Sequence, residues 1–482
     1  MNYKMMGRFI AQMVAVEAVF LLPALGISLA YRESGAVFAF LWTLLAMLSV
    51  SALLLLLCRK TKRNIFGARE GLVCVGLGWA ALSFLGCLPL WLSGQTPMLI
   101  DALFEMVSGF TTTGASILSD VESLPKGLLY WRSFSPWLGG MGVLVFLLAL
   151  APAEGGFTMH LLRAESPGPN VGKLAPRMRK TAAILYVIYI ALTAVNVVFL
   201  LLGGMDLLEA LCTAFGTAGT GGFGIRNDSM ASYNPYIQNV CTVFMFLFGV
   251  NFSCYYLLLL RQARGVFRDE ELRLYLGLAA VSIGLIVWNV RPLYDSLEET
   301  VRHAAFQVSS IMTTTGFATT DFDRWPGLSK AVLLMLMVVG ACAGSTGGGF
   351  KCARVLLVFK SLRRNIRQVL NPKKVMVVRN NGQAVDETVL SNTNAYLAAY
   401  SIILVLSFVV ISMDGFSVTT NLSAVLACFN NIGPGLEAVG PTCNYAGYSV
   451  LSKLVLIVDM LAGRLEIFPI LALLSRSTWK GR

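Results

Sequence analysis

The segment Ser309-Ser310-Ile311-Met312-Thr313-Thr314-Thr315-Gly316-Phe317 decides the fold that we expect for this chain. Its tetrad Thr-Thr-Thr-Gly occurs once more, at residues 111–114. Each copy follows an apolar stretch and a short, partly acidic segment. Small hydroxyl residues that end on glycine allow a turn whose carbonyl groups can point inward. A loop needs such a turn if its backbone is to replace the hydration shell of an ion.

The composition indicates a membrane protein. Of the 482 residues, 56% are hydrophobic and only 13% are charged, and the mean hydropathy is +0.69. A soluble protein cannot bury that much apolar side chain. The ten cysteines lie mostly in apolar runs, which is typical of small core residues, and only two histidines, His160 and His303, are present. We therefore expect neither a disulfide framework nor a histidine-based metal site.

Ten apolar stretches are long enough to cross a bilayer core of ~30 Å, which takes about 20 helical residues. They lie near residues 9–30, 36–57, 71–93, 131–151, 181–203, 237–260, 272–292, 330–362, 392–413 and 449–474. Because the first is long enough to span and a second follows directly, we expect no cleavable signal. Four semi-apolar segments are too short to span and have the size of re-entrant half-helices: 100–109, 206–216, 298–312 and 416–430.

The predicted fold is an all-α polytopic membrane protein with ten transmembrane segments. Four pseudo-repeats of helix, pore loop and helix surround a central pore, and an N-terminal two-helix hairpin stands outside them. The expected units are the hairpin at 1–70 and repeats at 71–180, 181–271, 272–390 and 391–482. Acidic residues near the half-helix starts favour helices whose negative ends point into the membrane, where four such ends would stabilise a cation.

The distribution of Lys and Arg predicts the orientation. One set of termini and loops (1–8, 58–70, 151–180, 261–273, 351–391 and 476–482) holds 28 Lys and Arg against 8 Asp and Glu. The alternate loops (31–35, 94–130, 204–236, 292–328 and 413–448) hold 5 against 15. We therefore expect both termini to be cytoplasmic. The net charge of +12 is then a topology signal, and nucleic acid binding is not needed to explain it.

Aligned on the half-helix ends, four loops are comparable, and backbone carbonyls just before each glycine can form rings of oxygen ligands. Such neutral ligands suit a weakly hydrated monovalent cation and suit Ca²⁺ or Mg²⁺ poorly. The alternative is that glycine and threonine here only permit close helix packing, but four loops at matching positions favour a filter. The expected cation-binding residues are Thr112, Thr113, Gly114, Gly219, Thr220, Gly221, Thr314, Thr315, Gly316, Asn431, Ile432 and Gly433.

Two sequence patterns typical of nucleotide binding lack the strand and helix context that such sites need, so we do not interpret them as nucleotide sites. Gly219, Gly221 and Gly224 match G-x-G-x-x-G, but they lie between apolar helices and not in a βαβ unit. The run at 340–351 resembles a P-loop, but Phe350 breaks the expected ending and no strand precedes it.

The glycine-rich run at 340–349 is better explained by its depth. Residues 331–340 make ~15 Å of helix, half of the bilayer core, so the run begins near the midplane beneath the third loop. Unwound backbone at that depth must line a cavity or be buried in protein, and under a cation filter it indicates a gate. A packing kink is the alternative. The expected gating residues are Gly344, Ser345, Thr346, Gly347, Gly348 and Gly349.

Two basic residues are expected to line the pore, Lys351 and Arg464. Arg464 lies about ten residues from either end of the last span, where its charge cannot easily reach water. Asp459 and Glu466, at i−5 and i+2, do not face it on a helix, so its partner must lie on another segment or in the pore. A purely structural ion pair is the alternative. The basic segment after Lys351 is a positive-inside flank and could also dock an acidic or nucleotide-binding partner.

Taken together, these residues resemble the Trk/Ktr/HKT superfamily of potassium transporters, and in particular its bacterial TrkH branch. The resemblance covers nearly the whole chain and includes Gly-Ser-Thr-Gly-Gly-Gly-Phe-Lys at 344–351, Asn-Asn-Ile-Gly-Pro-Gly-Leu at 430–436 and Gly-Arg-Leu-Glu-Ile-Phe at 463–468. It implies a K⁺ filter at Gly114, Gly221, Gly316 and Gly433 and a gating loop at 340–349, with Arg464 near the permeation path. In HKT relatives, Ser at the first filter position accompanies Na⁺ selectivity, so Gly114 favours K⁺. Gly224 departs from the Ser or Thr common in the family.

The resemblance also implies cellular context. It implies K⁺ uptake across the bacterial inner membrane by a homodimer bound to a cytosolic ring of nucleotide-binding, TrkA-like regulatory subunits. K⁺ would be the transported ion, with no covalently bound cofactor, and channel-like and H⁺- or Na⁺-coupled transport both stay open. The alternative is a Na⁺-permeable or Na⁺-coupled relative. An intramembrane enzyme is not expected, because the chain has no His-Glu-x-x-His motif and no Gly-x-Ser-x-Gly elbow.

Overall fold

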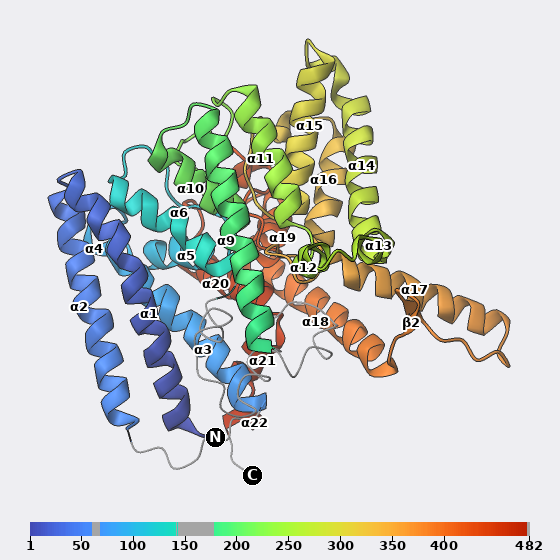
Figure 1. Ribbon diagram of the computed structural model, residues 1–482, viewed down its shortest axis with the longest axis horizontal. Coiled ribbons are helices and arrows are strands. Elements are labelled where there is room, and N and C mark those ends of the chain that lie inside the picture. Colours follow the sequence, from blue (N-terminus) through green and yellow to red (C-terminus); the bar gives the residue numbers. More distant parts are fainter. Residues whose placement is uncertain (60–67, 141, 143–177, 480–482) are drawn as a thin grey trace.

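The computed structural model describes residues 1–59, 68–140, 142 and 178–479 of the chain, and nearly all of its regular structure is helical (Figure 1). In the first half the elements are α1 (Tyr3–Ala30), α2 (Ser34–Leu57), α3 (Ala68–Gly86), α4 (Leu88–Leu92), α5 (Leu99–Phe110), α6 (Lys126–Gly140), α9 (Met178–Leu202), α10 (Leu207–Ala218), α11 (Pro235–Phe248), α12 (Phe252–Leu259) and α13 (Ala263–Arg268).

In the second half they are α14 (Glu270–Val290), η3 (Arg291–Leu293), α15 (Leu297–Met312), η4 (Phe322–Arg324), α16 (Gly327–Val339), α17 (Cys352–Leu370), β1 (Arg379–Asn380), β2 (Gln383–Ala384), α18 (Glu387–Ile411), η5 (Ser412–Asp414), α19 (Val418–Phe429), η6 (Glu437–Val439), α20 (Val450–Arg464), α21 (Phe468–Leu474) and α22 (Arg476–Trp479). The two strands pair antiparallel, with Arg379 opposite Ala384.

Six helical stretches within the described residues are long and apolar enough to cross a membrane: Tyr3–Ala30, Ser34–Leu57, Arg69–Leu92, Ala182–Leu202, Glu270–Leu293 and Glu387–Asp414. The pair α11 and α12 makes a seventh if its 86° bend is counted within one span. The polytopic helical class predicted from the sequence is therefore confirmed.

Of the three remaining predicted spans, two are each divided into two helices, and the third extends outside the described residues. The stretch at 131–151 runs beyond α6 into residues outside the described part of the chain, as do most of the basic loops at 58–70 and 151–180. The stretch at 330–362 is divided into α16 and α17, and the one at 449–474 into α20 and α21. Both divisions contain residues in the left-handed region, among them Gly340, Lys351, Glu466 and Ile467, so the hydrogen-bond ladder of a helix cannot continue there.

Long helices at the periphery expose apolar side chains. On α2 these include Phe38, Trp42 and Leu56, which are 61%, 50% and 67% exposed. Similar apolar faces occur on α9, at Val187 and Leu202, and on α18. Exposed apolar area on this scale would cause a soluble protein to aggregate, whereas hydrocarbon solvates it. These faces therefore mark the lipid-facing surface.

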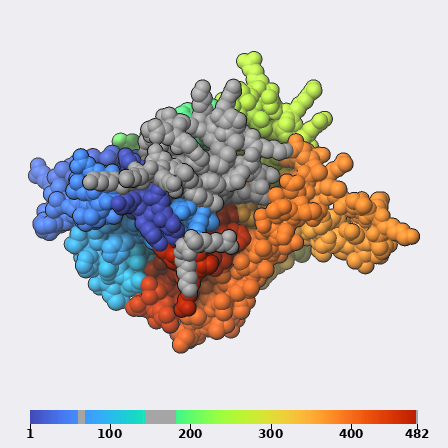
Figure 2. Space-filling view, turned by 90° about the horizontal axis from the view of Figure 1, so that it is seen from below, coloured from blue at the N-terminus to red at the C-terminus, as the bar shows by residue number. Residues whose placement is uncertain are grey.

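The N-terminal hairpin, α1 and α2, lies at one edge of the molecule (Figure 1). Its helix α1 packs through Met13, Ala18 and Leu21 into a core cluster that also holds Trp79 of α3 and Trp131 of α6. At the opposite edge, α17 projects sideways, roughly across the direction of α14 and α16 (Figure 1). Seen from below, the hairpin and the α17 region occupy opposite ends of the molecule (Figure 2). The starts of α1 and of α22 lie on the same side, which we call the terminal side (Figure 1).

Candidate functional site: four interlocked glycine turns

Four short helices end in the same hydrogen-bonded turn. They are α5, α10, α15 and α19, and each overlaps one of the half-helices predicted from the sequence. In each, the amide two residues beyond the C-cap donates to a carbonyl in the last helical turn, which is the Schellman motif. The four bonds are Thr113 to Ser108 at 2.8 Å, Gly221 to Gly216 at 2.9 Å, Thr315 to Ser310 at 2.8 Å and Ile432 to Ala427 at 2.9 Å. We call residues 111–114, 219–222, 313–316 and 430–433 the four glycine turns.

One residue of each glycine turn adopts the left-handed conformation without being glycine. These residues are Thr112, Thr220, Thr314 and Asn431, with φ between 53° and 60°. A β-branched residue is an outlier there, and such strain costs about 1–3 kcal/mol per site. Strain at three threonines, together with the same conformation at Asn431, which tolerates it better, indicates that the turn geometry itself is required.

The glycine with positive φ follows two residues later in every turn, and it is Gly114, Gly222, Gly316 and Gly433. In the second turn this places Gly222 at the position for which sequence alignment predicts Gly221, so the register is one residue later than predicted. Gly219 is the C-cap of α10, and a side chain there would strike the Pro136 backbone of α6. A doubled glycine cannot be placed by spacing alone, and only the φ values distinguish the two.

The four turns interlock in a closed ring. A Cβ atom added to any of the four positive-φ glycines would collide with a carbonyl oxygen of the next turn. At Gly433, for example, it would lie 2.8 Å from the Thr113 oxygen. The contacts run from Gly114 to the Gly221 carbonyl, from Gly222 to that of Thr315, from Gly316 to that of Ile432 and from Gly433 to that of Thr113. Because the fourth contact returns to the first turn, the four turns form a closed ring.

A buried ion pair supports the first and second turns. Arg132 of α6 donates to Glu105 of α5 at 2.6 Å, and both side chains are almost completely buried. Glu105 also accepts from the hydroxyl and amide of the loop after Gly114, at Ser116 and Ile117. The guanidinium stacks on Phe223 at 3.8 Å and donates to the Gly224 carbonyl at 2.9 Å. Glu105 therefore has a structural role, and no sequence signal paired it with Arg132.

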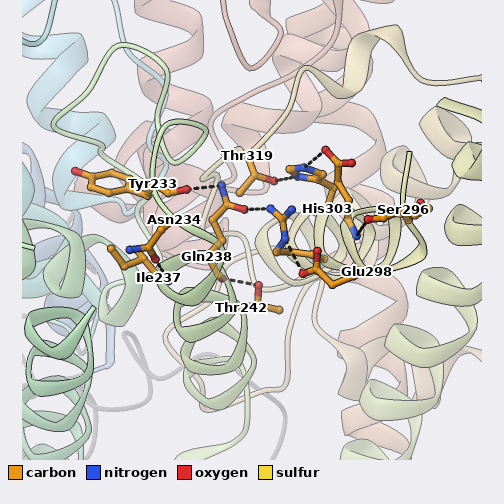
Figure 3. Close-up of polar contacts among 12 residues, drawn as sticks. Tyr233, Asn234, Ile237, Gln238, Thr242, Ser296, Glu298, His303 and Thr319 are labelled. Atoms are coloured by element: carbon orange, nitrogen blue, oxygen red, sulfur yellow. Dashed lines mark hydrogen bonds and ion pairs between the residues drawn. The ribbon is translucent and has the colours of Figure 1, made fainter. Parts of the chain in front are cut away.

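A second network fixes α15, which carries the third turn (Figure 3). Gln238 of α11 donates to the Met230 and Tyr233 carbonyls at 3.0 and 3.1 Å and accepts from Arg302, which pairs with Glu298 at 2.9 Å. His303 bonds the Thr319 hydroxyl at 2.8 Å, beyond the turn (Figure 3). Within the described residues, no three His, Cys, Asp or Glu side chains are placed to hold a metal ion.

The fourth turn is tied to the first by side chains. Asn431 donates to the Thr113 hydroxyl at 3.0 Å and to the Met460 carbonyl of α20 at 2.9 Å. Tyr445 donates to the Gly433 carbonyl at 2.7 Å. Near the start of α19, hydrogen bonds from Ser417 and Thr420 hold the pKa of Glu437 below its usual value, so this carboxylate stays ionised.

The residues between α16 and α17 lie directly against the turns. The Gly348 amide donates to the Thr314 hydroxyl at 2.6 Å. Gly347 lies so close to the Thr313 carbonyl that a Cβ atom would be 2.8 Å from it, and Gly348 lies similarly against Asn430. We call residues 340–349 the glycine-rich loop. Its predicted place beneath the third turn agrees with these contacts, and it also meets the fourth.

Arg464 connects the glycine-rich loop to the first turn. It donates to the Thr346 carbonyl at 2.8 Å and to the Thr112 hydroxyl at 3.2 Å. It also donates to two carbonyls at the end of α6, those of Gly139 at 2.5 Å and Gly140 at 2.7 Å. These partners lie on other segments, as its spacing from Asp459 and Glu466 predicts. Glu466 instead pairs with Arg354.

Lys351 is buried and adopts a positive φ of 78°. Its ammonium donates to the Gly347 carbonyl, so this charge stays at the end of the glycine-rich loop. Both predicted pore-lining charges therefore lie within hydrogen-bond reach of the loop.

The fold and the site define a class: a polytopic helical membrane protein built around four interlocked glycine turns. A sequence profile of the TrkH family, described as a cation transport protein, matches residues 36–478. The chain belongs to the TrkH family of cation transport proteins.

Its relatives match over their full length. It is 35% identical to the Trk system potassium uptake protein TrkH of Salmonella typhimurium and 34% identical to that of Escherichia coli K12, with 100% of each chain covered. It is 32% identical to TrkG of Escherichia coli K12 over 97% of both chains. The crystal structure of the potassium transporter TrkH from Vibrio parahaemolyticus superposes with a TM-score of 0.90, at 30% identity and over 100% of both chains. The predicted family resemblance is thereby confirmed.

Proposed function

We propose that the protein is the pore subunit of a Trk-type potassium uptake system, and that K⁺ loses its water among the carbonyls of the four glycine turns. The observation that carries the proposal is the closed ring of contacts between each positive-φ glycine and the carbonyl before its counterpart. Full-length similarity to Trk system potassium uptake proteins supports the same ion.

The proposed ligands are backbone oxygens from the residues before each glycine, including Thr113, Gly221, Thr315 and Ile432. The buried carboxylate of Glu105 is neutralised by Arg132, so it leaves no fixed negative charge for a divalent ion. A ring of neutral oxygens favours a cation with a weakly held hydration shell. A sodium-permeable or sodium-coupled transporter is the second candidate, since it would use the same ring with a different spacing.

The proposed topology has ten crossings in four repeats, with the N-terminal hairpin outside the ring. The six continuous spans and the bent pair α11–α12 support seven of these crossings. Interrupted helices would supply the rest, which is allowed where the unwound backbone is buried in protein. The proposed orientation puts the terminal side, and hence both termini, on the cytoplasmic face of a bacterial inner membrane, and the excess of Lys and Arg in alternate loops supports it.

The glycine-rich loop is proposed to be the gate. It touches the third and fourth turns, and Arg464 holds it to the first; the proposed topology puts it on the terminal side of the turns. A cation leaving the ring toward the cytoplasm would meet this loop. Opening then requires breaking the bonds from Gly348 to Thr314 and from Arg464 to Thr346.

Two partners are proposed: a second copy of the chain and a cytosolic nucleotide-binding regulatory subunit. The names of the relatives, which describe a Trk system, support an assembly of more than one component. The basic segment after Lys351 provides a docking surface for a regulator on the terminal side.

Uptake of ⁸⁶Rb⁺ into cells that lack their own potassium transporters tests the proposal. Expression of this chain with its regulatory subunit should restore growth at low K⁺ and saturable ⁸⁶Rb⁺ uptake that excess Na⁺ does not inhibit. Equal Na⁺ and Rb⁺ uptake would support the sodium-permeable candidate instead. Absence of uptake of either ion, with the protein present in the membrane, would refute both.

A further inference from the structure

Glu271 bridges the two limbs of the proposed gate. It stands in the first turn of α14, where its side chain is buried. One carboxylate oxygen accepts from the Ala343 amide at 2.5 Å and from the Ala353 amide at 3.1 Å. Ala343 lies in the glycine-rich loop, and Ala353 lies in the first turn of α17 beyond it. A single side chain from a third segment thus holds both ends of the loop.

The chemistry of this bridge suits a detachable contact. The first amides of a helix have no partner within the helix, so the Ala353 amide of α17 needs an outside acceptor. A carboxyl oxygen is a good acceptor for such amides, and it accepts most strongly when the group is ionised. A backbone hydrogen bond also joins the two ends of the loop, because the Cys352 amide donates to the Ala341 carbonyl at 2.9 Å. The hydrogen bonds to Glu271 hold the same two ends together from a third segment.

The same acidic segment reaches the β1–β2 hairpin on the terminal side. Asn381, at the tip of that hairpin, donates to Asp269 at 2.8 Å and to Glu270 at 3.2 Å, and accepts from the Glu270 amide at 2.9 Å. Lys360 of α17 pairs with Glu270 and donates to the Arg379 carbonyl at 2.8 Å. Residues 269–271 therefore contact the hairpin on one side and the glycine-rich loop on the other.

We infer that Glu271 is a positioning residue that latches the glycine-rich loop closed, and that the β1–β2 hairpin sets the latch through residues 269–271. The inference rests on the proposed role of the loop as the gate. A displaced hairpin would pull on the start of α14, separate Glu271 from the two amides and free the loop.

Amide hydrogen exchange of the full-length protein in lipid nanodiscs tests the latch without any transport. Glu271→Ala removes the acceptor, so peptides containing Ala343 and Ala353 should exchange about tenfold faster, the effect of losing roughly one charge-assisted bond. Glu271→Gln keeps a neutral oxygen and should fall between wild type and Ala. If attraction to the Lys351 charge were the role of Glu271, Gln and Ala would exchange equally, which would overturn the latch.

Two further variants keep the test decisive. Glu271→Asp shortens the side chain and should speed exchange even if Glu271→Ala cannot be purified. Glu387→Gln is the control, because this exposed acid pairs with Arg364 at the start of α18 and contacts no part of the loop. Unchanged exchange in the Asp and Gln variants would refute the latch. Asn381→Ala should also speed exchange at Ala343, and no change there would refute the connection to the hairpin.

⁸⁶Rb⁺ flux into proteoliposomes separates this inference from the proposed function. Faster exchange together with a several-fold higher basal flux supports both the latch and the gate. Faster exchange with wild-type flux leaves the latch standing and refutes the loop as the gate. Unchanged exchange refutes the latch, whatever the flux of the variant.

Discussion

A threonine in the left-handed region strains the backbone, but the same conformation can place its hydroxyl in a stabilising hydrogen bond. Single substitutions can separate these two effects. At Thr314 the strained backbone places a hydroxyl where the Gly348 amide bonds it. At Thr220 the hydroxyl bonds only its own neighbour, the Gly219 carbonyl, among the contacts seen. Both threonines are therefore strained, but of the two only Thr314 bonds the glycine-rich loop through its hydroxyl.

We predict that Thr220→Gly raises the free energy of unfolding by about 1 kcal/mol, because relief of strain exceeds the added flexibility of the unfolded chain. Thr314→Gly gains the same relief but loses the bond to Gly348, so it should be no more stable than wild type. Thermal unfolding in one detergent measures both. Equal gains for the two variants would show that the bond to Gly348 contributes nothing.

The first turn should be sensitive to a small side chain. Gly114→Ser places a Cβ atom against the Gly221 carbonyl, so the ring must open and discriminate less between K⁺ and Na⁺. The control is Gly94→Ser, since Gly94 also has a positive φ, of 75°, but no atom lies within 4 Å of an added Cβ. Competition of Na⁺ with ⁸⁶Rb⁺ uptake measures the effect. Unchanged selectivity in Gly114→Ser would contradict the filter assignment.

At the scale of elements, the short helices were predictable and their supports were not. The four half-helices follow from apolar patterning, and the observed ends lie within two residues of the predicted ones. The register of the second turn was missed because three of its four residues are glycine, and the sequence does not show which of them adopts the positive φ. Arg132, Gln238 and Glu271 were missed because their partners lie 27, 64 and 72 or more residues away. Only the fold brings such pairs together.

The ion pair between α5 and α6 should be worth far more than a surface pair. Arg132→Met leaves Glu105 buried and charged without its partner, which costs about 3–5 kcal/mol. Arg324→Met breaks the pair with Asp321, in which the arginine side chain is 86% exposed, and should cost about 0–1 kcal/mol. Chemical unfolding curves compare the two. Similar losses would mean that water reaches Glu105.

Shortening the connection between α16 and α17 tests it as an element. Deleting Gly347 and Gly348 removes the contacts with Thr313, Thr314 and Asn430, so basal ⁸⁶Rb⁺ flux should rise several-fold. Deletion of Gly94 and Gln95, in the turn after α4, is the control for a shortened chain. Wild-type flux in the Gly347–Gly348 deletion would show that the loop serves helix packing and is not the gate.

At the scale of the molecule, one cysteine reports the orientation. Nine of the ten cysteines are buried and Cys443 is exposed. If the terminal side is cytoplasmic, Cys443 faces outward, and an impermeant maleimide should label it in intact spheroplasts. A cysteine placed at Val375, which is 90% exposed, should react only after permeabilisation. The reverse pattern would invert the topology, and Cys443→Ser controls for other sites.

The ring also sets an order of events during biosynthesis. Gly433 closes on Thr113, a contact that spans 320 residues of chain. At about 5–20 residues per second, synthesis needs roughly 15–60 s to cover that distance. During that time the first turn has been synthesised but its last neighbour has not. Closure therefore cannot precede the synthesis of residue 433, and a chain truncated anywhere before that residue has no complete ring.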